Sequence, residues 1–217
     1  MTEQEPLRIG LVLFPGFQAL DAFGPLDVLN TLSWSHPLTI SLLSSSLSPV
    51  TTQNPLVPGS TGQKILPTHT FADAPPLDAL IVPGGFGTRL VTTPPIQDAI
   101  AYVRTVYPSL KYLITVCTGS LLTARTGILD GKQATTNKKA FREIERQFPQ
   151  VQWVARARWV VDGNIWTASG VSAGIDVALA WVAEVWGEQV ADEVARGVEV
   201  DRRRDSRDDP FAVVHGV

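Results

Sequence analysis

The chain has 217 residues, of which 44% are hydrophobic and 18% are charged, a balance typical of a globular protein with a substantial core and not of a disordered or fibrous one. Its formal net charge is −3 and charges of both signs are spread along the chain, so we expect no basic surface for nucleic acid. The first ten residues lack the features of a secretion signal, and no uncharged apolar stretch reaches the ~18 residues that a membrane helix needs.

From the N-terminus onward, apolar runs that predict strands alternate with amphipathic segments that predict helices. The first strand is expected at residues 9–14 and the first helix near 20–29. Residues 38–43 predict a second strand, and the stretch 44–63, rich in Ser, Thr, Pro and Gly, predicts a long loop or a hairpin. This order is typical of an α/β fold with a mostly parallel sheet and helices on both faces.

The middle of the chain predicts two strand–turn–helix units. In the first, a buried strand at 79–82 ends in a glycine turn and is followed by a helix at 95–106 that begins with proline. In the second, a strand at 112–116 ends at Cys117, and a helix of small and apolar residues follows and closes at Gly127. The cysteine is therefore predicted at a junction between a strand and a helix.

The second half of the chain continues with a predicted amphipathic helix at 140–148. The pair Asp162 and Gly163 stands between two β-type runs and predicts a hairpin. The last strong helix is expected at 173–186, and a weaker helical stretch follows it.

The charged run DRRRDSRDD at 201–209 is interpreted as a solvated helix end or a frayed tail, because its acids offset its arginines. No internal repeat and no shift in composition marks a second domain. We therefore predict one domain over residues 1–217, with a core at about 8–186 and a C-terminal helix and tail at 187–217.

Cys117 is the main candidate for chemistry. It is expected at the carboxyl edge of the sheet, where open α/β folds bind ligands, and the start of the next helix would lower the pKa of its thiol. The small residues that follow permit a sharp turn like a nucleophile elbow. A buried structural cysteine is the alternative. As the chain's single cysteine it cannot form an internal disulfide, which favours a cytoplasmic or nuclear protein.

Two other groups are expected at the same edge of the sheet. The turn at 83–85 could present backbone N–H groups to a developing negative charge, or it could be an ordinary tight turn. Asp21 follows the first strand and could supply a carboxylate to hold a water or exchange a proton. Its alternative is a helix N-cap.

Four blocks of the sequence carry a resemblance to a known family: IGLVLFPGFQALDAFGPLDVL, DALIVPGGFG, ITVCTGSLLTARTGILDGKQATTN and SGVSAGIDVAL. In this order and with compatible gaps they resemble the ThiJ/PfpI superfamily over most of the chain. The resemblance implies an α/β, flavodoxin-like three-layer sandwich, usually a homodimer. The LD-x-x-GP pattern and CTGS resemble the isocyanide hydratase branch most closely.

The resemblance also implies a reaction. Cys117 would be the nucleophile, Asp21 the acid, and Thr118 its hydroxyl neighbour. The thiolate would attack an isocyanide carbon, and water would release an N-substituted formamide from the thioimidate, with no metal or organic cofactor. Oxyanion or substrate-binding positions would be Gly84, Gly85, Phe86, Gly119 and Val171.

The sequence departs from its relatives in its histidines. Protease-like members have a histidine directly after the cysteine, where this chain has Thr118, so peptidase activity is disfavoured. The related hydratase pattern has a histidine where this chain has Asn137, which leaves the substrate range open. None of His36, His69 and His215 has metal-ligand spacing with the cysteine.

Three other functions remain open. A glyoxalase-like or deglycating enzyme acting on reactive aldehydes would normally use a histidine near the cysteine. A sensor would use oxidation of Cys117 to a sulfinate stabilised by Asp21. A transcription regulator would need helix-turn-helix motifs, and the chain ends about thirty residues after residue 186, too few for a pair of them. The expected partners are a small-molecule substrate and a second copy of the chain.

Overall fold

The computed structural model describes residues 6–217, so residues 1–5 of the predicted domain lie outside the described residues. Over this range a seven-stranded sheet has the order β10-β11-β7-β6-β1-β2-β5. Its strands are parallel except for the antiparallel pair β10 and β11. The strands are β1 (Leu7–Val12), β2 (Leu38–Ser44), β5 (His69–Thr70), β6 (Ala79–Val82), β7 (Tyr112–Val116), β10 (Trp159–Asp162) and β11 (Ile165–Ala168).

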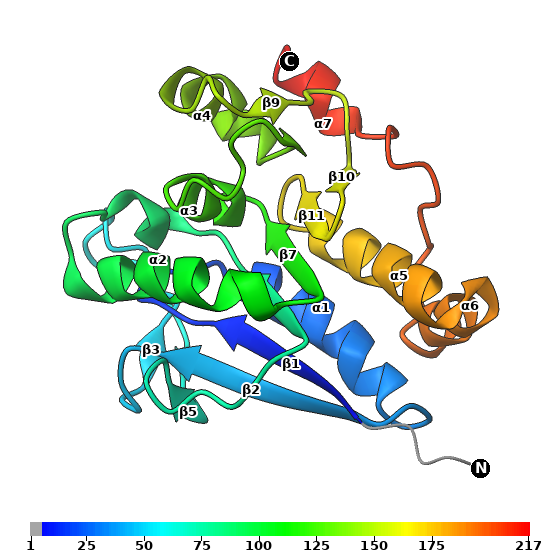
Figure 1. The fold of residues 1–217 in the computed structure, drawn as a ribbon. Helices are drawn as coiled ribbons and strands as arrows, with labels where there is room; N and C mark the ends of the chain where they lie inside the picture. Colours follow the sequence, from blue (N-terminus) through cyan, green and yellow to red (C-terminus); the bar gives the residue numbers. More distant parts are fainter. Residues whose placement is uncertain (1–5) are drawn as a thin grey trace.

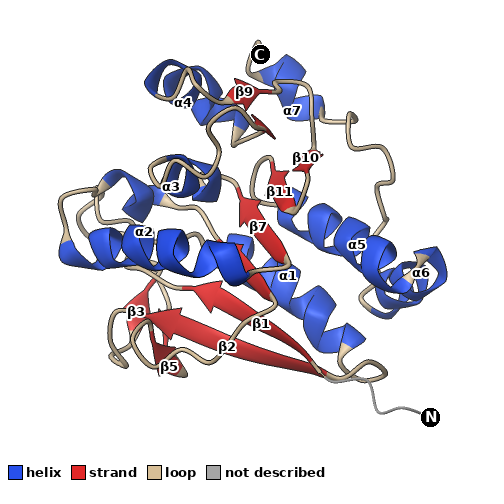
Figure 2. Ribbon diagram, in the orientation of Figure 1, coloured by secondary structure: helices blue, strands red, loops and turns tan. Residues whose placement is uncertain are grey.

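Helices cover both faces of this sheet, which confirms the predicted three-layer α/β sandwich (Figure 1). Helices α1, α5 and α6 pack together on one face, and α2 and α3 lie over the other (Figure 2). Helices α4 and α7 lie beyond the carboxyl ends of β7 and β11. The helices are α1 (Ala19–Leu32), α2 (Pro94–Val106), α3 (Gly119–Ala124), α4 (Phe141–Gln147), α5 (Ala173–Trp186), α6 (Glu188–Gly197) and α7 (Pro210–Val214).

The central strands have apolar side chains on both of their faces. All four residues of β6 and all four of β11 are buried, as are the last four of β7. A parallel strand covered by helices on both faces needs such a continuous apolar run, and an alternating pattern would leave polar side chains in one of the layers. The core therefore lies on both sides of the β6–β7–β11 region.

The topology leaves a crevice at one edge of the sheet. In chain order the strands β1, β2, β6, β7 and β11 occupy the spatial order 2-1-3-4-5. The chain thus moves outward from β1 to β2 and then crosses to the other side of β1 with β6. Open α/β sheets bind ligands beyond the carboxyl ends of the strands at this switch point.

Most predicted elements are confirmed, with small shifts at their ends. The strands at 79–82 and 112–116 and the helix at 173–186 have the predicted bounds, and Asp162 and Gly163 form the turn between β10 and β11. The first strand lies two residues earlier than predicted. The helix after Cys117 ends at Ala124, before Gly127.

Two segments that gave weaker signals form short elements. The 44–63 stretch contains β3 (Val50–Thr51), which pairs antiparallel with β4 (Lys64–Ile65), so the hairpin alternative is confirmed. The helix predicted at 140–148 is divided into a 3-10 turn, Lys138–Ala140, and α4. Strands β8 (Gln133–Ala134) and β9 (Gln152–Trp153) pair on either side of it, and 3-10 turns also cover Phe86–Arg89 and Tyr107–Ser109.

Residues 201, 204, 205, 207 and 208 are exposed, as the interpretation of 201–209 as a solvated helix end or frayed tail predicts, but Arg202 and Asp209 contradict it. The Arg202 side chain is largely buried and contacts Glu188 and Asp192 of α6 at 2.6 and 2.8 Å. The Asp209 side chain is 0% exposed and leads directly into α7. The charges that compensate these residues come from distant parts of the chain, so composition within the run did not reveal them.

None of the helices in residues 6–217 is both long enough and apolar enough to cross a membrane.

Candidate functional site

Cys117 occupies the turn between β7 and α3 in a left-handed backbone conformation, with φ of +56°. Such a φ is uncommon outside glycine and is kept only where neighbouring bonds enforce it. Here the Cys117 N–H donates to the carbonyl oxygen of Ser169 at 2.8 Å. Its carbonyl oxygen accepts from Ser120 Oγ at 3.0 Å and from Thr136 Oγ1 at 3.1 Å. Cys117 thus lies in the sharp turn between a strand and a helix that the sequence predicted.

The thiol of Cys117 is buried, with 6% of the residue exposed, and polar groups surround it. Asn137 Nδ2 donates to Sγ at 3.2 Å, and the Thr118 N–H also bonds the sulfur. Burial raises the pKa of Cys117, and the neighbouring Asp21 carboxylate raises it further. The sequence led us to expect a lowered pKa at a helix start, but α3 has only six residues and the loss of solvation outweighs its effect.

Asp21 lies in the first turn of α1 and is fully buried beside Cys117. Its Oδ2 accepts from the Gly84 N–H at 3.0 Å, whereas its Oδ1 has no hydrogen-bond partner of suitable geometry within residues 6–217. Burial raises the pKa of Asp21 to about 7. The N-cap alternative is wrong, because Gln18 occupies that position. Asp21 and the thiol form a coupled pair that can hold and exchange one proton.

The glycines of the site allow its backbone segments to approach closely. A Cβ at Gly84 would overlap Thr118 N and lie 2.9 Å from Asp21 Oδ2, and one at Gly119 would overlap the carbonyl oxygen of Val82. Gly85 has φ of +126°, and its N–H donates to Thr118 Oγ1 at 2.9 Å. The Gly85 N–H, which we expected to face the intermediate, thus bonds the threonine beside the cysteine.

A cavity of about 400 Å³ opens over Cys117. Four more of the predicted residues line it, namely Gly85, Phe86, Thr118 and Val171. The other three, Asp21, Gly84 and Gly119, are buried behind this lining. All the predicted site residues therefore lie at one end of the sheet. Some of them line the cavity, and the others are buried behind the residues that line it.

Asn137 contacts the Cys117 sulfur, and the sequence did not assign it a role. Its Oδ1 accepts from the Ala140 N–H at 3.3 Å and caps the short turn that precedes α4. This bond orients the amide so that Nδ2 faces Cys117 Sγ. The departure from the related histidine at this position was the only signal in the sequence. Gln18, Arg89, Lys139 and Glu143 also line the cavity and were not predicted.

No histidine of the chain lines the Cys117 cavity, and all three lie in the described part of it. Within the same residues 6–217, no group of three His, Cys, Asp or Glu side chains could hold a metal ion. The groups at the cavity are the Cys117 thiol, the Asn137 amide and charged side chains, with the Asp21 carboxyl group behind them.

Comparison with known proteins finds a family match and several similar proteins. The model of the DJ-1/PfpI family matches residues 7–184. Isonitrile hydratase of Pseudomonas putida is 37% identical over 195 residues, which are 89% of this chain and 78% of that protein. The HTH-type transcriptional regulator GbdR of Pseudomonas aeruginosa is 26% identical, and the match covers 94% of this chain but 54% of the regulator.

The solved structures agree with the sequence matches. The crystal structure of a ThiJ/PfpI family protein from Pseudomonas syringae superimposes with a TM-score of 0.77 at 29% identity, over 93% of this chain and 78% of that one. The match of the family model over most of the chain and the identity to isonitrile hydratase are sufficient to assign the family. The chain belongs to the DJ-1/PfpI family.

Proposed function

We propose that this protein is an isocyanide hydratase, a lyase that converts an isocyanide to an N-substituted formamide through a covalent bond to Cys117. The observation that carries the proposal is the buried pair of Cys117, which lines the cavity, and Asp21, which lies behind the lining with a raised pKa. The 37% identity to isonitrile hydratase supports the same reaction.

The first half of the reaction adds the thiol to the isocyanide. As sulfur bonds the terminal carbon, Asp21 accepts the thiol proton and returns it to that carbon, which gives the thioimidate R–N=CH–S–Cys117. A carboxyl group with a pKa raised to about 7 is suited to this exchange, because it both accepts and releases a proton near neutral pH. Atoms balance, since the thioimidate is the sum of the isocyanide and the thiol.

The second half adds water to the thioimidate carbon. The C–S bond breaks, one proton of the water goes to the nitrogen, and the other returns to the Cys117–Asp21 pair, which releases R–NH–CHO. Asn137 Nδ2, 3.2 Å from Sγ, is placed to stabilise the negative charge on the departing sulfur. The Thr118 N–H bonds the same sulfur.

Aldehyde chemistry of the glyoxalase or deglycase type has less support, because within residues 6–217 no histidine lines the Cys117 cavity, and His215 lines only the neighbouring one. The resemblance to dimeric relatives leads us to propose in addition that the protein acts as a homodimer on a small-molecule substrate.

The test is the formation of formamide from phenyl isocyanide, followed by ultraviolet absorbance. We expect Cys117→Ala to abolish turnover, because the covalent step is lost, and Asp21→Asn to reduce it about 100-fold, the typical size of a lost acid–base group. Mass spectrometry after an acid quench should detect the thioimidate on the wild-type protein. Circular dichroism serves as the control for folding, and turnover retained by folded Cys117→Ala would exclude the covalent mechanism.

A further inference from the structure

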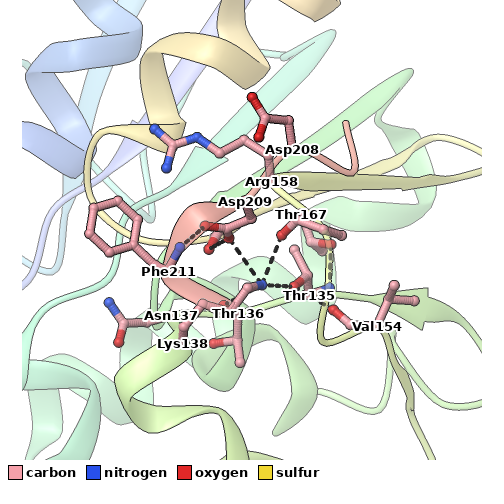
Figure 3. A network of polar contacts seen from close by, with 12 residues as sticks. Thr135, Thr136, Asn137, Lys138, Val154, Arg158, Thr167, Asp208, Asp209 and Phe211 are labelled. Atoms are coloured by element: carbon pink, nitrogen blue, oxygen red, sulfur yellow. Dashed lines mark hydrogen bonds and ion pairs between the residues drawn. The ribbon is translucent and has the colours of Figure 1, made fainter. Parts of the chain in front are cut away.

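The C-terminal segment, residues 201–217, is docked onto the rest of the protein by a buried carboxylate. Asp209 Oδ2 lies 3.5 Å from Lys138 Nζ and accepts from Ser169 Oγ at 2.5 Å, while its Oδ1 accepts from the Phe211 N–H at 3.0 Å and caps α7. The Arg158 N–H donates to Ser206 O at 2.6 Å. Figure 3 shows Asp209 directed from this segment toward Lys138, with Phe211 beside them.

Asp209 contacts Lys138 and Ser169, and both of these residues are close to Cys117. Lys138 follows Asn137, which donates to the sulfur, and Lys138 Nζ also donates to Thr135 Oγ1 at 2.6 Å. Ser169 supplies the carbonyl oxygen that accepts the Cys117 N–H. The position of α7 is thus fixed relative to the thiol through short chains of contacts.

A second cavity, of about 410 Å³, lies next to the one over Cys117. The two share Asn137, Lys139 and Val171 in their linings. The outer wall of the second cavity includes Phe211 from α7, and Leu20 from the start of α1 also lines it. Phe211 is 46% exposed and Leu20 is 42% exposed, so both present apolar surface that no other part of the described chain covers.

The charged side chains of this second cavity are largely neutralised. Lys138 is paired with Asp209, and Arg158 contacts Asp176 at 2.7 Å. Lys139 is exposed to solvent. His215 also lines the cavity, beside the apolar surface that Leu20, Val171 and Phe211 offer a ligand.

We propose that the C-terminal segment completes the substrate site: α7, held by Asp209, forms the outer wall of a subsite for the apolar substituent on the isocyanide nitrogen. The inference rests on the proposed function and names its substrate class, isocyanides with an aryl or branched alkyl group. The R–N≡C group is linear, so a substituent extends away from the carbon that Cys117 attacks. The second cavity adjoins the first and receives it.

The first test compares phenyl isocyanide with methyl isocyanide as substrates of Phe211→Ala. We expect kcat/KM for phenyl isocyanide to fall about tenfold, mainly through KM, because apolar contact with the substituent is lost, and kcat/KM for methyl isocyanide to stay within about twofold. Val213→Ala is the matched control, since Val213 lies on the same helix, is 73% exposed and does not line the cavity. An equal fall for both substrates, or no fall for either, would overturn the inference.

A second measurement separates this inference from the proposed function. If the wild-type protein turns over no isocyanide, the proposed function fails, and the subsite is then tested by the rate at which N-phenylmaleimide and N-methylmaleimide alkylate Cys117. Phe211→Ala should lower the ratio of the phenyl rate to the methyl rate about tenfold, the same order as its effect on kcat/KM. An unchanged ratio would show that α7 does not form a wall of the site.

The positioning role of Asp209 is tested with Asp209→Asn. This variant keeps the size of the side chain and removes the charge that pairs with Lys138. We expect amide hydrogen exchange over residues 210–214 to become faster and the preference for the phenyl over the methyl reagent to fall. Unchanged exchange would refute the docking role of Asp209, and faster exchange with an unchanged preference would refute the wall role of α7.

Discussion

At the scale of single residues, the main feature of the site is a buried carboxyl group beside a buried thiol. Asp21 and Cys117 come from segments far apart in the sequence. Burial raises the pKa of both groups, and the Asp21 carboxylate raises the pKa of the thiol further, whereas the hydrogen bond with Cys117 lowers the pKa of Asp21. The carboxyl group lacks a hydrogen-bond partner for Oδ1 within the described residues, which is costly for a buried charge. Burial therefore favours the protonated form of Asp21 below about pH 7.

This pairing predicts a pH dependence of stability. The pKa of Asp21 is raised to about 7 from 3.8, so the folded protein binds a proton that the unfolded chain has released. A raised pKa contributes stability that is complete below about pH 4 and is lost as pH rises to 7. Between pH 5 and pH 8 the wild-type protein should lose roughly 3 kcal/mol of unfolding free energy relative to Asp21→Asn. Urea unfolding at the two pH values measures this, and parallel pH profiles would contradict it.

Asn137 gives a second prediction at this scale. Its amide hydrogen bond stabilises the thiolate, because the donor faces Sγ, so Asn137→Ala should raise the pKa of Cys117 and lower kcat about tenfold. The pH dependence of the alkylation rate of Cys117 reports this pKa. Asn137→Asp, which has the same size but carries a charge, should raise the pKa further. If both variants alkylate with the wild-type pH profile, the hydrogen bond has no role in the thiol chemistry.

At the scale of elements, the close approach of α3 to the end of β6 explains why a glycine follows Thr118. Gly119→Ala would place a Cβ against the carbonyl oxygen of Val82, and neither backbone can move without displacing Cys117. We expect a loss of about 2–4 kcal/mol in unfolding free energy, as for other overpacked buried positions. Gly197→Ala is the matched control, since its Cβ would meet only Thr31 at 3.4 Å. Equal stability of the two variants would contradict this account.

The elements also show what local sequence could and could not predict. The apolar runs of β6 and β7 and the amphipathic pattern of α5 depend on neighbouring residues, so their bounds were predicted correctly. The ion pair of Lys138 and Asp209 joins residues 71 positions apart (209 − 138), and nothing near either one reveals its partner. The position of Asn137 at the sulfur likewise depends on the packing of a distant loop. Long-range polar pairing is the part of this fold that pattern analysis misses.

At the scale of the whole molecule, the sheet order determines where the chemistry lies. The 2-1-3-4-5 arrangement brings the carboxyl ends of β1, β6 and β7 together, and each of these ends is followed by one part of the site. These parts are Asp21, the glycine turn at 83–85 and Cys117. The family match ends at residue 184, and Asp209 contacts the site region from beyond it. The proposed site thus combines the sheet edge, which lies within the family match, with a C-terminal segment that lies outside residues 7–184.

The oligomeric state is the last prediction. We expect a homodimer, so light scattering on purified protein at micromolar concentration should give about twice the chain mass of 23.5 kDa. The large apolar side chains exposed on the described surface, Trp34 at 81% among them, are consistent with association, because exposed apolar surface often marks a contact. On dilution, the mass should stay unchanged until the protein concentration falls to the dissociation constant of the dimer. A mass of one chain at every concentration would contradict the homodimer.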